Sequence, residues 1–151
     1  MTLSIRPNAP FDLTPLTRLL TDADDLARVN PSAKHPFDPL EWQEKWLAEP
    51  DDASYYLLDD AGREVGFFAL RIGVGPEVRH LAYVYVAPEV RGGAGHALAG
   101  MAEDMARELG ALSLSLKVET ENAPALKVYQ DAGYEELSRR AGMATMRRDL
   151  D

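Results

Sequence analysis

The chain has 151 residues, a net charge of −9 and no cysteine, which fits one soluble domain and excludes disulfides, thiolate catalysis and thiolate metal ligands. The acidic balance argues against a binder of nucleic-acid phosphates, and no apolar run approaches the roughly 20 residues that span a bilayer. Residues 1–20 lack the apolar core and cleavage site of a signal peptide, so we expect a cytoplasmic protein without a membrane contact.

The first third of the chain predicts a short strand followed by helices. Residues 2–6 suit a strand, and helices are expected to start at Thr14, Asp22 and Asp38, the second ending at Val29. Thr14 and Asp38 are residues that cap helices, and each is followed by a proline, which suits the first helical position.

Acidic residues are concentrated between positions 22 and 60. This segment holds eleven Asp or Glu and three Lys or Arg, which leaves a charge of −8. Such a segment is most often a solvated surface, but it also attracts cationic substrates. We therefore expect that a substrate of this protein is cationic.

Three strands are expected next. Residues 54–58 and 64–74 are joined by Asp59-Asp60-Ala61-Gly62, a composition typical of a turn. Residues 80–86 are nearly all apolar or aromatic, which predicts a central strand covered on both faces.

The rest of the chain alternates helices and strands. A helix is expected from Ala97 through Leu109, with its apolar face at Ala97, Met101, Met105 and Leu109 and its end at Gly110. A strand over 112–118, a helix between Asn122 and Gly133, and strands over 134–137 and 143–150 follow. This order predicts a mixed α/β sheet with antiparallel hairpins and at least one parallel crossover.

Residues 87–100, APEVRGGAGHALAG, place a glycine turn between a strand and a helix. Free N–H groups at a helix start bind anions, glycine lets a phosphate approach, and Arg91 adds a donor fork. The P-loop and the dinucleotide fingerprint do not match, because Gly95 is followed by His96-Ala97-Leu98. A glycine turn without a ligand stays open as the alternative.

Residues 120–134, TENAPALKVYQDAGY, form a second pattern around one short helix. Asn122 caps this helix and Gly133 ends it, while Tyr129 lies one turn beyond Ala125 on the same face. Taken alone, Tyr129 is equally well explained as a core residue.

Together the two stretches resemble the GNAT family of N-acetyltransferases. The family's Val-x-Pro element and Arg/Gln-x-x-Gly-x-Gly/Ala turn correspond to Val86-Ala87-Pro88 and residues 91–97, and its Asn, Ala, Tyr and Gly-Phe/Tyr series to residues 122–134. The resemblance covers roughly residues 50–140 and implies one GNAT-like domain over 1–151. It implies a mostly antiparallel sheet of about six to seven strands flanked by helices, with a splayed parallel central strand pair.

The resemblance also implies acetyl-CoA as co-substrate. No metal is expected, because the three histidines are too scattered in the sequence for the spacing of metal ligands. The residues placed at the cofactor are Tyr85, Val86, Arg91, Gly92, Gly93, Ala94, Gly95, His96, Ala97 and Asn122. One departure concerns the turn: counted back from a helix that starts at Ala97-Leu98, Arg91 stands one residue too close. We interpret this as a pyrophosphate turn shortened by one residue.

For catalysis, the resemblance places Tyr129 as the acid that protonates the departing thiolate. His80, six residues before Val86, stands where family members carry a base, and an imidazole suits that role near neutral pH. Glu77 and Tyr83 remain rivals for the base, and a solvent-facing histidine remains the structural alternative.

The expected function is acetyl transfer to a primary amine of a small molecule or peptide. Phe37, Trp42 and Trp46 are expected either in the core or lining the acceptor pocket. A homodimer is left open, and neither nucleic acid nor membrane is expected as a partner. The alternatives are a non-catalytic acyl-CoA-binding module and a partner-dependent regulatory subunit.

Overall fold

The computed structural model describes residues 2–73, 75 and 77–150, and its centre is a sheet in the order β1-β2-β3-β4-β5-β7-β6. All neighbours are antiparallel except β4 and β5, which are parallel. The strands are β1 (Ser4–Pro7), β2 (Ala53–Leu58), β3 (Glu64–Ile72), β4 (Val78–Val86), β5 (Ser113–Glu119), β6 (Glu135–Arg140) and β7 (Met143–Asp149). The mixed, mostly antiparallel sheet with a parallel central pair is as predicted; the predicted end of the second strand at Val74 lies outside the described residues.

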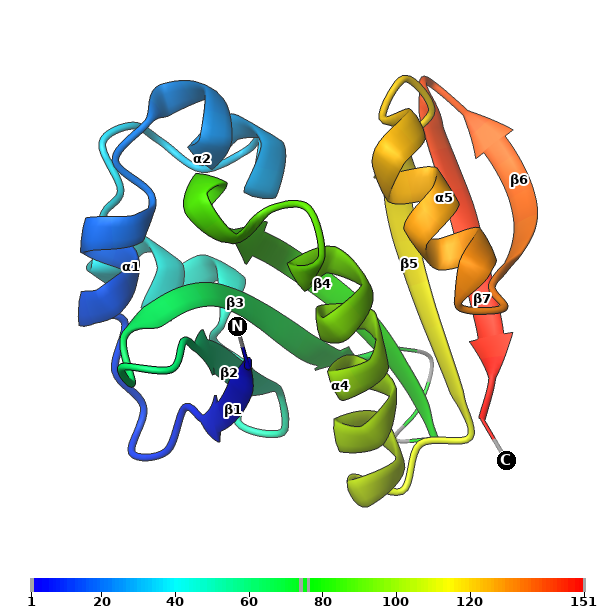
Figure 1. Ribbon diagram of the computed structural model, residues 1–151, viewed down its shortest axis with the longest axis horizontal. Coiled ribbons are helices and arrows are strands. Elements are labelled where there is room, and N and C mark those ends of the chain that lie inside the picture. Colours follow the sequence, from blue (N-terminus) through cyan, green and yellow to red (C-terminus); the bar gives the residue numbers. More distant parts are fainter. Residues whose placement is uncertain (1, 74, 76, 151) are drawn as a thin grey trace.

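Helices cover the sheet, with α1 against β3, α2 against β4, and α4 against both of those strands. In Figure 1 α5 lies alongside β5 and β7, on the far side of α4 from α1 and α2. The helical elements are α1 (Thr14–Leu19), α2 (Ala23–Val29), α3 (Pro39–Glu41), a π-helical turn η1 (Trp42–Trp46), a 3₁₀ turn η2 (Pro88–Val90), α4 (Ala94–Glu108) and α5 (Ala123–Asp131).

The helix starts agree with the sequence prediction in part. Asp22 and Asp38 do cap α2 and α3, each accepting a backbone N–H. Thr14 is not a cap, because it is already helical and its own N–H donates to Asp12 Oδ1 at 2.9 Å. The prediction was wrong there because Asp12 also lies within reach of this helix start and is the stronger acceptor.

The predicted start and apolar face of α4 were also wrong. The helix begins at Ala94, and its buried face carries Ala94, Leu98, Ala102 and Ala106 rather than the stripe through the methionines. Small side chains let the helix approach the sheet closely, which propensity and periodicity alone do not reveal. Gly110, with φ of +83°, ends the helix as expected.

β4 changes course halfway along its length. Tyr83 has a φ of +55°, rare for a residue other than glycine, and the β3–β4 register shifts around it. The pairing of β4 with β5 runs from Val78↔Ser113 to Leu81↔Leu116 and ends there. Beyond Leu81 the two parallel strands therefore separate. Ala82, Tyr83 and Val84 are only partly buried, so the prediction that both faces of β4 are covered was wrong for this part.

An ion pair ties the C-terminal half together. Arg148 of β7 donates to Glu103 Oε1 of α4 at 2.8 Å and to the Ala132 carbonyl at the end of α5. Burial raises the pKa of Glu103, although Arg148 opposes this effect. The pair is thus partly desolvated, and removing Arg148 would leave a carboxyl group without its partner.

We expect Arg148→Met to lower the free energy of unfolding by about 2 kcal/mol, less than the roughly 3–5 kcal/mol of a fully buried pair because Arg148 is partly exposed. The matched control is Arg147→Met, whose pair with Asp149 is largely exposed. That variant should change stability by about 0.5 kcal/mol or less. Chemical denaturation measures both, and equal losses would contradict the assignment.

Within the described residues, no helix has both the length and the apolar character needed to cross a membrane. In the same part of the chain, no three His, Asp or Glu side chains gather as a metal site would require.

Candidate active site

A cavity of about 790 Å³ opens where β4 and β5 separate. Its walls come from β4, β5, α2, α5 and the turn that leads into α4. Of the predicted site residues, those that line it are Tyr129, His80, Tyr85, Val86, Arg91, Gly92, Gly93, Gly95, His96 and Asn122. Ala94 and Ala97 do not line it: Ala94 is buried, and the Ala97 N–H is used by the Gly93 carbonyl.

The glycine turn presents free backbone donors. Gly92 has a φ of +112°, which favours glycine, and Gly93 precedes the first helical residue. Among the described residues, no carbonyl accepts from the N–H groups of residues 92–96. A Cβ added at Gly92 or Gly93 would meet nothing within 4 Å. The earlier helix start places Gly95 and His96 in the first turn, so this open edge fits an anion such as the CoA pyrophosphate.

Arg91 holds this turn against the end of β4. Its Nε donates to the Val86 carbonyl at 2.8 Å, and its guanidinium lies 3.5 Å from Asp25 and above the Tyr85 ring. Because Nε and Nη2 of Arg91 are bonded to Val86 and Asp25, Arg91 positions the turn and adds positive charge beside it.

Backbone donors are also available on β4. The Ala87 N–H donates to the Val65 carbonyl of β3. In an antiparallel pair every second residue bonds to the partner strand in this way, so the Tyr85 N–H also points toward β3. The Val86 N–H then points away from β3, toward the space that β5 has left. It is the better placed of the two predicted backbone donors.

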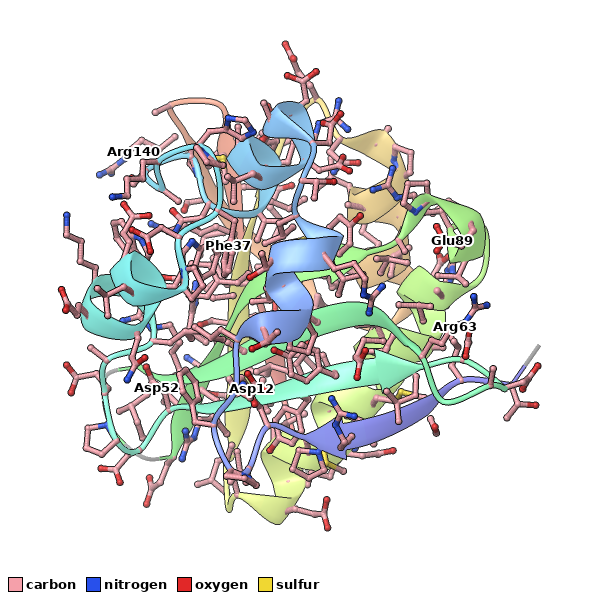
Figure 2. The ribbon with its side chains drawn as sticks, turned by 90° about the vertical axis from the view of Figure 1, so that its left-hand side faces the viewer. Asp12, Phe37, Asp52, Arg63, Glu89 and Arg140 are labelled. Carbon is pink, nitrogen blue, oxygen red and sulfur yellow. The ribbon has the colours of Figure 1, made fainter. Side chains whose placement is uncertain are left out.

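Tyr56 shows which side chains share a face of the sheet. Its hydroxyl donates to the Asp12 carbonyl at 2.6 Å, just before α1, and Figure 2 shows Asp12 at the lower end of that helix, in front of the strands. Phe67 pairs with Tyr56, and side chains alternate, so Arg71 lies on the α1 face too. His80 pairs with Arg71 and shares that face.

The side chain of His80 contacts Ser115 on the neighbouring strand β5. Its Nδ1 lies 3.1 Å from Ser115 Oγ of β5. Burial lowers the pKa of His80, and the positive charges of Lys117 and Arg71 lower it further. The imidazole is therefore neutral at neutral pH, and no described residue bonds to its Nε2, which is what a base requires.

The two rivals for the base differ in position. Tyr83 lines the cavity, but its hydroxyl accepts from Arg71 at 3.3 Å and burial raises its pKa, so it holds its proton at neutral pH. Glu77 lies before β4, at the opposite end from the cavity, and is exposed. Geometry favours His80.

Tyr129 lies on α5, where its ring packs edge-on against Tyr134. Burial raises the pKa of Tyr129 to about 12. No hydrogen bond from the described residues engages its hydroxyl, although the residue lines the cavity. Tyr134, whose buried hydroxyl also has no partner among the described residues, shows that a core role is possible, but Tyr129 differs from it by lining the cavity.

Asn122 and His96 frame the α5 side of the cavity. Asn122 Oδ1 accepts from Ala125 N–H at 3.2 Å and thereby caps α5, as predicted. His96 lies 3.4 Å from Asp131 at the other end of α5. The first contact defines the start of α5, and the second joins its end to the residue that follows Gly95 in the glycine turn.

The aromatic residues before β2 belong to the core in two cases. Trp42 is fully buried, and Phe37 packs against it at a ring separation of 5.3 Å. Trp42 also contacts the Tyr83 ring at 5.0 Å, so it supports the bulge of β4 from behind. The described residues that line the cavity do not include Phe37, Trp42 or Trp46.

Sequence reasoning missed Ser115, Lys117 and Arg71 as site residues. All three lie on the same face as His80, and Lys117 lines the cavity. The alternation of polar and apolar residues over 112–118 was the available signal, but it does not say which face meets a site.

Comparisons with known proteins agree with this geometry. Residues 17–134 match the model of a family described as "Acetyltransferase (GNAT) family". An uncharacterized N-acetyltransferase of Methanocaldococcus jannaschii is 30% identical over 129 residues, which cover 76% of this chain. The match spans 57% of that relative, so this chain covers little more than half its length.

Solved structures are similar over most of the chain. A spermidine N-acetyltransferase from Vibrio cholerae, in complex with CoA and spermine, has a TM-score of 0.78 at 19% identity, covering 98% of this chain and 95% of that one. The GNAT domain of S. lividans PAT has a TM-score of 0.79 at 20% identity, covering 99% and 92%. A nourseothricin acetyltransferase is 30% identical over 68% of this chain and 67% of its own, with a TM-score of 0.57.

Proposed function

The chain belongs to the acetyltransferase (GNAT) family, and from that premise we propose that it moves an acetyl group from acetyl-CoA to a primary amine by direct transfer. One observation carries the proposal: the free N–H groups of the glycine turn, a neutral His80 and the unpaired Tyr129 hydroxyl all meet one cavity. The similarity to a structure that holds CoA and spermine supports the choice of donor and of an amine acceptor.

When bound, acetyl-CoA supplies the acetyl group: an N–C bond forms, the C–S bond breaks, the amine loses a proton and the sulfur gains one. The glycine turn would hold the pyrophosphate, with Arg91 adding positive charge. The Val86 N–H would point into the space between the separated strands and orient the thioester carbonyl there.

His80 would take the proton from the amine. When Nδ1–H donates to Ser115 Oγ, the lone pair of Nε2 is left to accept. Because burial lowers the pKa of His80 from its ordinary value, this lone pair stays free through the neutral range, and protonation of His80 would limit activity only at acidic pH.

Tyr129 would donate a hydrogen bond to the sulfur. A phenol with a pKa of about 12 is always protonated near neutral pH. Complete proton transfer to a thiolate, whose thiol has an ordinary pKa of about 8.5, is uphill, so the hydrogen bond is the main contribution and solvent completes the transfer.

We expect His80→Ala to lower turnover by about 10²-fold near neutral pH and by less at about pH 9.5. At the higher pH more of the amine, with an ordinary pKa near 10.4, is already deprotonated, so the base matters less. Turnover across pH, followed by thiol release, measures this. A loss that does not vary with pH would move the proton acceptor to water.

The two alternatives predict different results in the same assay. A non-catalytic acyl-CoA-binding module would be stabilised by acetyl-CoA but would release no thiol with any amine. A partner-dependent subunit would release thiol only once its partner is added. Cytoplasmic location and a homodimer remain predictions.

A further inference from the structure

The charge of the cavity is opposite to that of the chain. Among the described residues that line it, four are basic and two acidic: Arg28, Arg91, Lys117 and Lys127 against Asp25 and Glu119. Of the eleven acidic residues between positions 22 and 60, Asp25 is the one that lines the cavity in the described part of the chain. The acidic segment therefore gives little support to a cationic acceptor.

Three of the four basic residues lie toward the glycine turn. Arg91 is part of that turn, and Arg28 follows Asp25, the partner of Arg91, by one turn of α2. Lys127 pairs with Asp131 at 3.2 Å, which also contacts His96. These cations face the part of the cavity assigned to the phosphates of the donor.

Lys117 lies at the other end, beside the proposed base. It follows Ser115 by two residues on β5, so its side chain leaves the same face as the His80 contact, just past the last β4–β5 pair. No hydrogen bond or ion pair from the described residues engages its ammonium group. A free cation here has no role in holding the phosphates.

Lys117 supplies the positive charge at this end of the cavity, because the other nearby cation, Arg71, is paired with Asp52. Arg71, opposite His80, is held by Asp52 at 3.3 Å and donates to Tyr83 at the cavity wall. Glu119 is the next residue on the Lys117 face, and it lies one further step away from His80 along β5. An incoming amine thus meets positive charge near the base and negative charge farther out.

We propose that the acceptor is a small amine that carries a carboxylate, which Lys117 binds while His80 receives the proton of the amine. This inference rests on the proposed acetyl transfer and names its substrate class. A carboxylate a few atoms from the reacting amine can pair with the ammonium group of Lys117, whereas a polyamine without a carboxylate leaves the charge of Lys117 unmatched.

The test compares amino acids with their own carboxamides, and with spermidine, as acceptors at saturating acetyl-CoA. We expect kcat/KM to be at least about tenfold higher for each acid than for its amide. Lys117→Gln should lower kcat/KM for the acids by about tenfold to a hundredfold and leave the amides nearly unchanged. Lys45→Gln, an exposed lysine outside the cavity, should change neither.

Glu119→Gln separates the two acceptor classes. If the acceptor is a polyamine, this variant will lose activity with spermidine while Lys117→Gln does not, which overturns the inference. If Lys117→Gln loses as much activity with the amides as with the acids, the inference is also overturned. The same holds if acetyl-CoA no longer stabilises Lys117→Gln, because Lys117 would then bind the donor and not the acceptor. If acetyl-CoA binds but no amine releases thiol, the proposed function itself fails, and this inference with it.

Discussion

Replacing Gly95 by glutamate is expected to abolish the stabilisation of the protein by acetyl-CoA. A ligand that binds only the folded state at about 100 times its Kd adds roughly 2.7 kcal/mol to the free energy of unfolding. In the variant, a carboxylate would stand at the free N–H groups that we assign to the pyrophosphate. The melting temperature with and without acetyl-CoA measures the effect.

The folded structure itself should tolerate this change. A Cβ at Gly95 would meet Val128 Cγ2 at 3.5 Å, an ordinary contact, and a negative charge in the first turn of a helix is favourable. The control is Gly100→Glu in the same helix, an exposed position with nothing within 4 Å. It should keep the whole shift, and an unchanged shift in Gly95→Glu would refute the anion site.

Tyr129→Phe is expected to reduce turnover by about 10²-fold while leaving acetyl-CoA binding nearly intact. The substitution removes one oxygen and keeps the ring against Tyr134, so packing is preserved. A positioned acid contributes roughly 10²–10⁴-fold, and the low end applies here because the raised pKa of Tyr129 restricts it to hydrogen-bond donation.

Stability and turnover, measured on the same sample, separate this role from a core role. A hydroxyl bonded to a buried partner would cost about 1 kcal/mol when lost, with little change in rate. The matched control is Tyr134→Phe, whose hydroxyl is buried and without a partner among the described residues. It should keep its turnover, and normal turnover in Tyr129→Phe would remove that residue from the mechanism.

Local features of the sequence were enough to predict the family, the order of the elements and the two motif regions. Asn122 caps α5 and Gly133 ends it with a φ of +95°, because capping and positive φ depend on residues a few positions apart. The open backbone at Gly92 and Gly93 follows from the same local chemistry.

Only the tertiary structure decided which side chains meet. His80 and Ser115 are 35 residues apart, and their contact exists because β4 and β5 pair in one register. A strand alternates its side chains regardless of what covers it, so the pattern around Lys117 does not reveal which face opens onto a cavity.

The same reason explains the error on the buried face of α4 and the small contribution of the acidic segment to the cavity. The buried stripe of α4 depends on how closely the helix approaches the sheet, which a repeat of apolar residues every four positions does not specify. The charge of the cavity depends on where the strands separate, and among the described residues only one of the eleven acidic side chains between positions 22 and 60 lines it. Caps and turns depend on residues close together in the sequence. Which side chains form a site depends on contacts between strands and helices that are distant in the chain.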